Sequence, residues 1–288
     1  MKVTRHGDAD EFWQLVAPLY TQDPIRHTIA LTVLKRVREG HGFGDADPIM
    51  LSISDEQQLA GAVFCTPPFP FGLSAMPVEA ARPVAEFLFA EGLKPTAAFG
   101  EYPNVEAFAA AWQELTGETS SVESDQRLYR LAEDEFAPPA DVPGELTFAI
   151  AADLDILLEY RRAFAVENGL AADLSGAEHA VRAFLESGGC QAIWRVDGKP
   201  VSMAAVGRPV AGMSRVAPVY TTPAERGHGY GSAVTAGVSQ WAIDQGASDV
   251  VLFTDLANPI SNSIYQRIGY RPVMDVLEVT FTEAEPLR

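Results

Sequence analysis

A glycine-rich turn between a predicted strand and a predicted helix constrains this chain more than any other feature. The stretch Thr221–Ser232 reads TTPAERGHGYGS, and its glycines alternate at Gly227, Gly229 and Gly231. β-prone residues precede it from position 214, and helix-prone residues follow it to position 245. In such a turn the backbone N–H groups point outward and the helix dipole adds partial positive charge. The sequence therefore predicts an anion site that holds a pyrophosphate without a lysine.

The second half of the chain alternates between predicted strands and helices. Asp197-Gly198 joins two strands, and Asp-Gly is typical of a β-hairpin. Asn258 and Pro259 begin the last helix, because asparagine caps helices and proline suits their first position. The predicted strands are 145–150, 190–196, 201–206, 213–220, 249–254 and 273–281, and the predicted helices are 154–166, 176–187, 232–245 and 258–269.

The first half repeats the same order, and a proline-rich segment separates the halves. Its predicted strands are 2–5, 49–54, 59–65, 71–75, 96–100 and 120–131, and its predicted helices are 10–20, 24–38, 76–90 and 105–115. Residues 134–144 read DEFAPPADVPG, and their prolines disfavour helix and central strand. We predict a domain at 1–133, a linker at 134–144 and a domain at 145–288. Where the second half has its glycine turn, the first has Ala75–Glu79, which lacks glycine and carries a phosphate-repelling glutamate.

The amino-acid composition limits which binding partners and which cellular compartment we expect for this protein. Among 288 residues, 39 are acidic and 21 basic, so the net charge is −18. Such a field repels nucleic acid and favours cationic partners such as amines. Cys65 and Cys190 are the only cysteines, and we expect both to be small buried hydrophobes. The first residues lack an apolar signal region and no apolar run approaches the roughly 18 residues of a membrane span. We therefore expect a cytoplasmic protein without nucleic-acid or membrane partners.

The glycine turn can be compared with three phosphate-binding patterns. No lysine follows the glycines, which disfavours a nucleoside-triphosphate loop. The spacing is GxGxG and a hairpin precedes it, which disfavours the dinucleotide fingerprint. The third pattern is [QR]-x-x-G-x-[GA], and Arg226-Gly-His-Gly-Tyr-Gly231 fits it.

This fit resembles the pyrophosphate loop of the GNAT superfamily, the acetyl-CoA-dependent N-acetyltransferases. The order of strands and helices in residues 145–281 is similar as well, and Tyr265-x-x-x-Gly269-Tyr270 looks like the end of the superfamily's last helix. The resemblance implies an α/β (α+β) fold with two GNAT-like domains, each a mixed, mostly antiparallel central sheet flanked by helices. The first would be a degenerate copy without a phosphate loop.

The resemblance also implies where acetyl-CoA binds and which residue is catalytic. Val219, Tyr220 and Thr221 would offer backbone groups to the pantetheine arm, and an N–H near Val219 would stabilise the oxyanion. Tyr265 would be the general acid that protonates the departing thiolate. The remaining cofactor-binding residues would be Arg226, Gly227, His228, Gly229, Tyr230, Gly231, Ser232 and Asn258, with Tyr265 also in contact, and no metal is implied.

Each of these residues also has a structural interpretation. His228 is a loop side chain, Asn258 a helix cap, Asn262 a surface residue, and Tyr265 a packing residue beside an isoleucine stripe. The general base is not readable from the sequence. Glu167 is a candidate base or amine contact, Asp173 and Glu178 are its rivals, and water is a further alternative.

Three functions remain open from the sequence. The first is acetyl transfer to a primary amine of a small molecule or peptide, by direct attack. The second is a non-catalytic acyl-CoA-binding or sensing protein, and the third is a nucleotide-binding module of another fold, which the missing lysine disfavours. We expect a monomer or homodimer.

Overall fold

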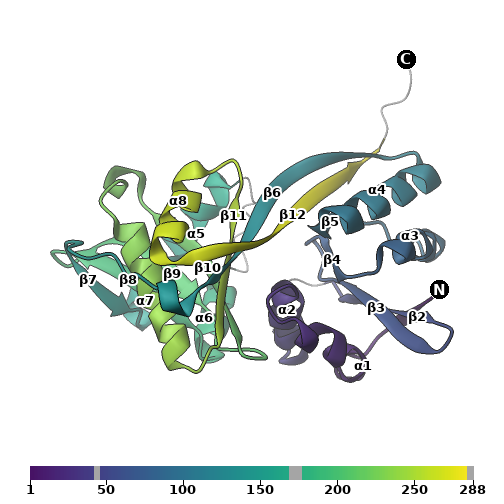
Figure 1. The fold of residues 1–288 in the computed structure, drawn as a ribbon, viewed down its shortest axis with the longest axis horizontal. Coiled ribbons are helices and arrows are strands. Elements are labelled where there is room, and N and C mark those ends of the chain that lie inside the picture. Colours follow the sequence, from purple (N-terminus) through teal and green to yellow (C-terminus); the bar gives the residue numbers. More distant parts are fainter. Residues whose placement is uncertain (42–45, 169–176, 284–288) are drawn as a thin grey trace, which may run out of the picture. The chain divides into compact units, whose positions relative to one another are not determined.

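The computed structural model describes residues 1–41, 46–168 and 177–283, which form two compact units (Figure 1). Unit 1 comprises Met1–Arg127, Asp255–Ala257 and Met274–Arg288, and unit 2 comprises Leu128–Thr254 and Asn258–Val273. Each unit is a mixed sheet with helices, as the resemblance implies.

Unit 1 has a mostly antiparallel sheet in the order β1-β2-β3-β4-β5-β12-β6. The pair β4–β5 is parallel. The strands are β1 (Lys2–His6), β2 (Ile49–Asp55), β3 (Gln58–Cys65), β4 (Phe71–Ala75), β5 (Ala97–Glu101), and parts of β6 (Thr119–Leu131) and β12 (Tyr270–Thr282); the helices are α1 (Ala9–Gln22), α2 (Thr28–Arg38), α3 (Ala81–Ala90) and α4 (Tyr102–Thr116).

Unit 2 repeats the pattern in the order β12-β6-β11-β10-β9-β8-β7. The pair β10–β11 is parallel, whereas β7–β8, β8–β9 and β9–β10 are antiparallel. The strands are β7 (Glu145–Phe148), β8 (Cys190–Val196), β9 (Lys199–Val206), β10 (Met213–Thr221) and β11 (Asp249–Asp255), with the remaining parts of β6 and β12; the helices are α5 (Leu154–Glu167), α6 (Ala177–Glu186), α7 (Tyr230–Asp244) and α8 (Pro259–Ile268).

The two faces of the unit 2 sheet carry separate cores. One core packs α7 and α8 against Ala192, Ala204 and Val216. The other packs α5 and α6 against Ile193 and Met203, together with Tyr220 of β10. Strand residues alternate between these cores because successive side chains point to opposite faces.

Local sequence sets the ends of the helices. The Asp8 side chain accepts hydrogen bonds from the N–H groups of Asp10 and Glu11, which begins α1. Asn258 accepts from Ser261 N–H at 3.0 Å at the start of α8, and Gly269, with φ of +114°, ends that helix. The predicted helix at 76–90 is instead a short 3₁₀ turn at Val78–Ala80 followed by α3.

The units differ from the predicted domains at two places. The long strands β6 and β12 contribute residues to both units, so the division falls after Arg127 and after Val273. The proline-rich segment 134–144 is part of unit 2 and packs within it. Ala137 N–H donates to the Ile268 carbonyl at 2.8 Å, and Trp194 Nε1 donates to the Pro143 carbonyl at 2.9 Å.

Both cysteines, Cys65 and Cys190, are buried free thiols, and burial raises the pKa of each to about 12. In the described part of the chain, no helix combines the length and apolar character that a membrane crossing needs. The same residues contain no cluster of three or more histidine, cysteine or acidic side chains that would suit a metal ion.

Candidate active site

Two neighbouring strands of unit 2, β10 and β11, separate from each other next to the glycine turn. The parallel ladder between β10 and β11 ends at Arg215 and Val251, whereas β10 continues to Thr221 and β11 to Asp255. The pairing of β10 with β9 is also irregular between Val216 and Val219. A β-bulge of this kind re-aims a strand and is common beside active sites. The end of β10 therefore leaves β11 and leads directly into the glycine turn.

The glycine turn presents a row of backbone donors. After a 3₁₀ turn at Pro223–Glu225, Gly227 and Gly229 have φ of +84° and +85°, and α7 begins at Tyr230. The backbone N–H groups of residues 227–232 donate no hydrogen bond to any acceptor among the described residues. Unbonded N–H groups at a helix start form an anion site, because the helix dipole adds to them.

The three glycines of the turn meet different needs. Gly227 and Gly229 have the positive φ that glycine adopts without strain. A Cβ atom at Gly229 would also lie 3.2 Å from Val142 Cγ2. A Cβ atom at Gly231 would lie 3.1 Å from Thr221 Oγ1, so this glycine allows the helix start to approach the end of β10.

Side chains of the turn lie outside the row of donors. The His228 ring stacks on Tyr230 with centroids 5.4 Å apart, and its Nδ1 lies 3.2 Å from the Glu225 carbonyl. Tyr230 is buried, and Ser232 is half-buried at the start of α7. His228, Tyr230 and Ser232 therefore contribute to the anion site through their backbone N–H groups.

Arg226 is held by three contacts. Its Nη2 donates to Glu167 Oε2 at 2.6 Å, and its Nε donates to the Thr221 carbonyl at 3.1 Å. Its guanidinium carbon lies 5.9 Å from the centre of the Tyr220 ring. Two residues predicted for separate roles, the phosphate-binding Arg226 and the candidate base Glu167, thus form one ion pair. Burial raises the pKa of Tyr220, and the negative charge of Glu167 raises it further.

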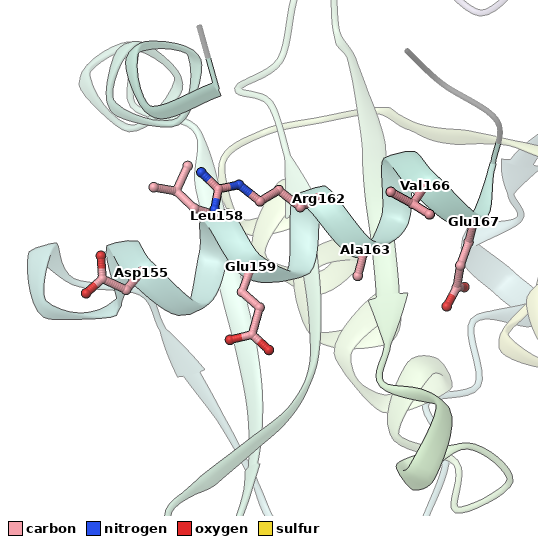
Figure 2. A pocket seen from close by; sticks show the side chains of 7 residues that line it. All are labelled: Asp155, Leu158, Glu159, Arg162, Ala163, Val166 and Glu167. Carbon is pink, nitrogen blue, oxygen red and sulfur yellow. The ribbon is translucent and has the colours of Figure 1, made fainter. Parts of the chain in front are cut away.

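Glu167 stands at the end of a groove along α5. Figure 2 shows side chains spaced three and four residues apart, which places them on one face of the helix. The lining residues are Asp155, Leu158, Glu159, Arg162, Ala163, Val166 and Glu167. Of the rival bases, Glu178 is paired with Arg182 at 2.8 Å, one turn along α6. Asp173 lies outside the described residues.

Tyr265 lies in the core between α8 and the sheet. Its ring meets Tyr270 edge-on with centroids 6.1 Å apart, and its hydroxyl makes no hydrogen bond to the described residues. Burial raises the pKa of Tyr265 to about 12. The phenol therefore stays protonated at neutral pH, as a proton donor must.

Asn258 and Asn262 lie at the first turns of α8. Asn258 is exposed and caps the helix, as its structural interpretation predicts. Asn262 is half-buried and accepts a hydrogen bond from the Tyr129 hydroxyl at 2.8 Å, a contact that its interpretation as a surface residue does not include. Tyr129 lies on β6, far away in the sequence, and for that reason the contact could not be read from the local pattern.

Ser202 is a residue of the site that sequence reasoning missed. It is fully buried on β9, and its Oγ donates to the Tyr220 carbonyl at 2.9 Å and lies 2.8 Å from Thr221 Oγ1. These bonds fix the end of β10 where it enters the turn. The sequence signal that could have identified Ser202 is its single hydroxyl in the otherwise apolar strand PVSMAAV.

The corresponding turn of unit 1 is built differently. The β4–β5 ladder covers Phe71–Gly72 and Ala98–Phe99, so it too ends early. A Cβ atom on Gly61 would lie 2.4 Å from Pro77 Cδ, which shows how closely Pro77 packs there. Asn104 Nδ2 donates to the Met76 carbonyl. A proline ring and a side-chain amide therefore lie where unit 2 has its glycines.

Comparison with known proteins gives a family and a fold. Residues 156–270 match the family described as "Acetyltransferase (GNAT) family". No sequence among the curated proteins matches this chain. Solved structures of similar fold cover nearly all of it.

Three such structures illustrate the likeness. A GCN5-related N-acetyltransferase from Kribbella flavida is 20% identical, covers 90% of this chain and 96% of its own, and has a TM-score of 0.57. A GNAT-family acetyltransferase from Colwellia psychrerythraea is 10% identical, with coverage of 99% and 100% and a TM-score of 0.59. A tandem GNAT protein from the clavulanic acid biosynthesis pathway is 14% identical, with coverage of 100% and 99% and a TM-score of 0.64.

At these identities the likeness is one of fold, and it extends through both halves of the chain. The family match itself includes the glycine turn, α7 and α8. Residues 156–270 thus match the GNAT acetyltransferase family, and the whole chain has the fold of solved GNAT structures.

Proposed function

We propose that this protein transfers the acetyl group of acetyl-CoA to a primary amine of a small molecule or peptide. One observation carries the proposal: the unbonded N–H groups of residues 227–232 lie at the start of α7, directly after β10 has parted from β11. The family match over residues 156–270 supports acetyl transfer in general. The cosubstrate and the residue roles are our inference from the geometry.

The residues present fit the diphosphate of coenzyme A. Six consecutive N–H groups without a protein acceptor lie beside the Arg226 guanidinium, and no acidic residue occupies the first turn of α7. Residues 219–221 of β10, beyond the end of the β11 ladder, would pair with the amide-rich pantetheine arm as a strand does. Bound acetyl-CoA would supply an acetyl group activated as a thioester.

The protein's own groups would then have three tasks. The backbone N–H near Val219 would donate to the acetyl oxygen as negative charge develops there. Tyr265 would give its hydroxyl proton to the departing sulfur, since its raised pKa keeps that proton in place at neutral pH. Asn258, at the start of α8, would contact the cofactor.

The amine must also lose a proton, and the proposal needs a group that accepts it. Glu167 is committed to Arg226 at 2.6 Å. The Glu167 carboxylate would have to leave this contact before it could face an amine. We therefore propose water as the first acceptor of this proton, with Glu167 as an amine contact or as a base after Arg226 turns toward the phosphates.

A non-catalytic acyl-CoA-binding protein is the second candidate, because the same turn would serve it. The presence of Tyr265, at the position that the resemblance gives to the general acid, favours the enzyme. Calorimetric titration with coenzyme A tests the shared site, and release of free thiol with a panel of primary amines tests turnover. Binding without turnover would favour the second candidate, and absence of binding would reject both.

A further inference from the structure

Gln191 is a buried amide without a partner. It lies on β8 and is 2% exposed, and neither its Nε2 nor its Oε1 has a hydrogen-bond partner in the described part of the chain. Leaving a buried donor or acceptor unbonded destabilises the fold, because the group has lost its hydrogen bonds to water. Most buried polar side chains are bonded, so an amide with both ends unbonded requires an explanation.

Strand pairing places Gln191 on the α5/α6 face of the sheet. Its neighbours on β8, Cys190 and Ala192, belong to the opposite core, whereas Ile193 belongs to the α5/α6 core. Side chains alternate along a strand, so Gln191 shares the face of Ile193. On that face Tyr220 of β10 packs near the glycine turn.

Gln191 also stands in line with the bulge of β10. It pairs with Ala205 on β9, and Ala205 lies between Val206, which pairs with Val216, and Ala204, which pairs with Val219. The two bulge residues, 217 and 218, are therefore opposite Ala205. On this face Ala205 lies between Gln191 and the bulge, which is two strands or roughly 10 Å away.

The face of the sheet opens at this bulge. Ala217 is exposed, although β10 is an interior strand with β9 and β11 on either side. Ala217 follows Val216 of the opposite core, so alternation places it on the α5/α6 face, and its exposure means that solvent reaches the bulge from that side. An amine that approaches the acetyl end of the proposed site, near Val219, would pass over this opening.

We propose that Gln191 forms an acceptor subsite that binds an amide group of the substrate, so that the acceptor is a primary amine carrying an amide a few bonds away. The subsite rests on the proposed function for its role in transfer, although not for its ability to bind an amide. The Gln191 N–H group would donate to the substrate carbonyl, and its carbonyl would accept from the substrate N–H. A carboxylate satisfies only the first of these bonds, because it has no hydrogen to donate at neutral pH.

The test uses β-alaninamide as the probe and n-butylamine and β-alanine as comparison ligands. Calorimetric titration is performed on the full chain, with and without saturating coenzyme A. We expect β-alaninamide to bind at least about tenfold more tightly than either comparison ligand, since a site built for hydrogen bonds rejects analogues that leave it unbonded. Gln191→Met should abolish that preference. The matched control is Gln240→Met, which makes the same change at an exposed position on α7 and should keep the preference.

Two outcomes would overturn the subsite. One is equal binding of β-alaninamide and n-butylamine by the unmutated protein. The other is a preference that persists in Gln191→Met while its melting temperature rises, as expected if a polar group has simply been replaced by an apolar one. Failure of coenzyme A to bind would count against the proposed function alone, because the titration without coenzyme A still reports on Gln191.

Discussion

Arg226 Nη2 donates to Glu167 Oε2 at 2.6 Å, so an ion pair joins the end of α5 to the glycine turn. Both side chains remain partly exposed, at 49% and 39%. An exposed ion pair contributes about 0–1 kcal/mol, which a doubly charged diphosphate can exceed. In the proposed function, Glu167 would therefore act as an internal anion that coenzyme A displaces from Arg226 or shares it with.

Replacing Glu167 should strengthen cofactor binding. In Glu167→Gln the carboxylate no longer competes for Arg226, and we expect the dissociation constant of coenzyme A to fall by about two- to fivefold, as a gain of up to ~1 kcal/mol implies. Titration calorimetry at low and high salt measures this dissociation constant. Glu159→Gln, on the same exposed face of α5, is the control and should leave affinity unchanged. Weaker binding in Glu167→Gln would show that Glu167 positions Arg226 instead of competing for it.

Gly229→Glu should abolish coenzyme A binding. The new side chain would carry negative charge at the anion site, meet Val142, and force a non-glycine residue to φ of +85°. The φ strain alone costs about 1–2 kcal/mol of stability. Gly92→Glu has a similar φ of +68° with no atom within 4 Å of the added Cβ, so it should lose similar stability and keep the affinity. Retained binding in Gly229→Glu would remove the turn from the cofactor site.

Tyr265→Phe should lower turnover by about 100-fold while the affinity for coenzyme A stays nearly the same, because general acid catalysis typically contributes 10²–10⁴ in rate. Steady-state kinetics with the best amine of the panel measures kcat. The control is Tyr270→Phe, which removes the hydroxyl of the neighbouring ring. Because that hydroxyl lies 2.7 Å from Ser239 Oγ, this variant should lose stability without the same loss of kcat. Equal kcat in Tyr265→Phe and the unmutated protein would contradict the acid role.

Burial of Tyr265 also predicts a loss of stability at high pH. Its pKa is about 12 in the folded chain and about 10 when unfolded. The folded state therefore holds the proton that the unfolded state releases, and this stability is present below pH 10 and lost as pH rises toward 12. Urea unfolding at pH 8 and pH 11.5 should show a greater loss for the unmutated protein than for Tyr265→Phe. The difference should approach about 2 kcal/mol, and equal losses would mean that the phenol is not desolvated.

Much of the fold was readable from the sequence because it depends on local signals. Turn residues such as Asp197-Gly198, the cap at Asn258 and the glycines at 227 and 229 each lie within a few residues of the structure they specify. The sequence order of strands and helices follows from such signals. The same signals indicated the family.

The rest depends on residues that meet only after folding. The ion pair of Glu167 with Arg226 joins residues 59 positions apart in the sequence. The hydrogen bond of Tyr129 with Asn262 joins residues 133 positions apart. The buried state of Gln191 follows from its pairing with Ala205, which local periodicity does not reveal. Val142 falls in the predicted linker, yet it lies next to Gly229.

The division of β6 and β12 between the units has a practical consequence for anyone who wishes to study the halves separately. A fragment that stops at position 133 would lack Met274–Thr282, and the unit 1 sheet would lose its pairing with β5 along Val276–Thr280. A fragment that starts at 145 would lack Leu128–Leu131 and would expose a strand edge, which invites aggregation. The two halves are therefore best studied together in the whole chain.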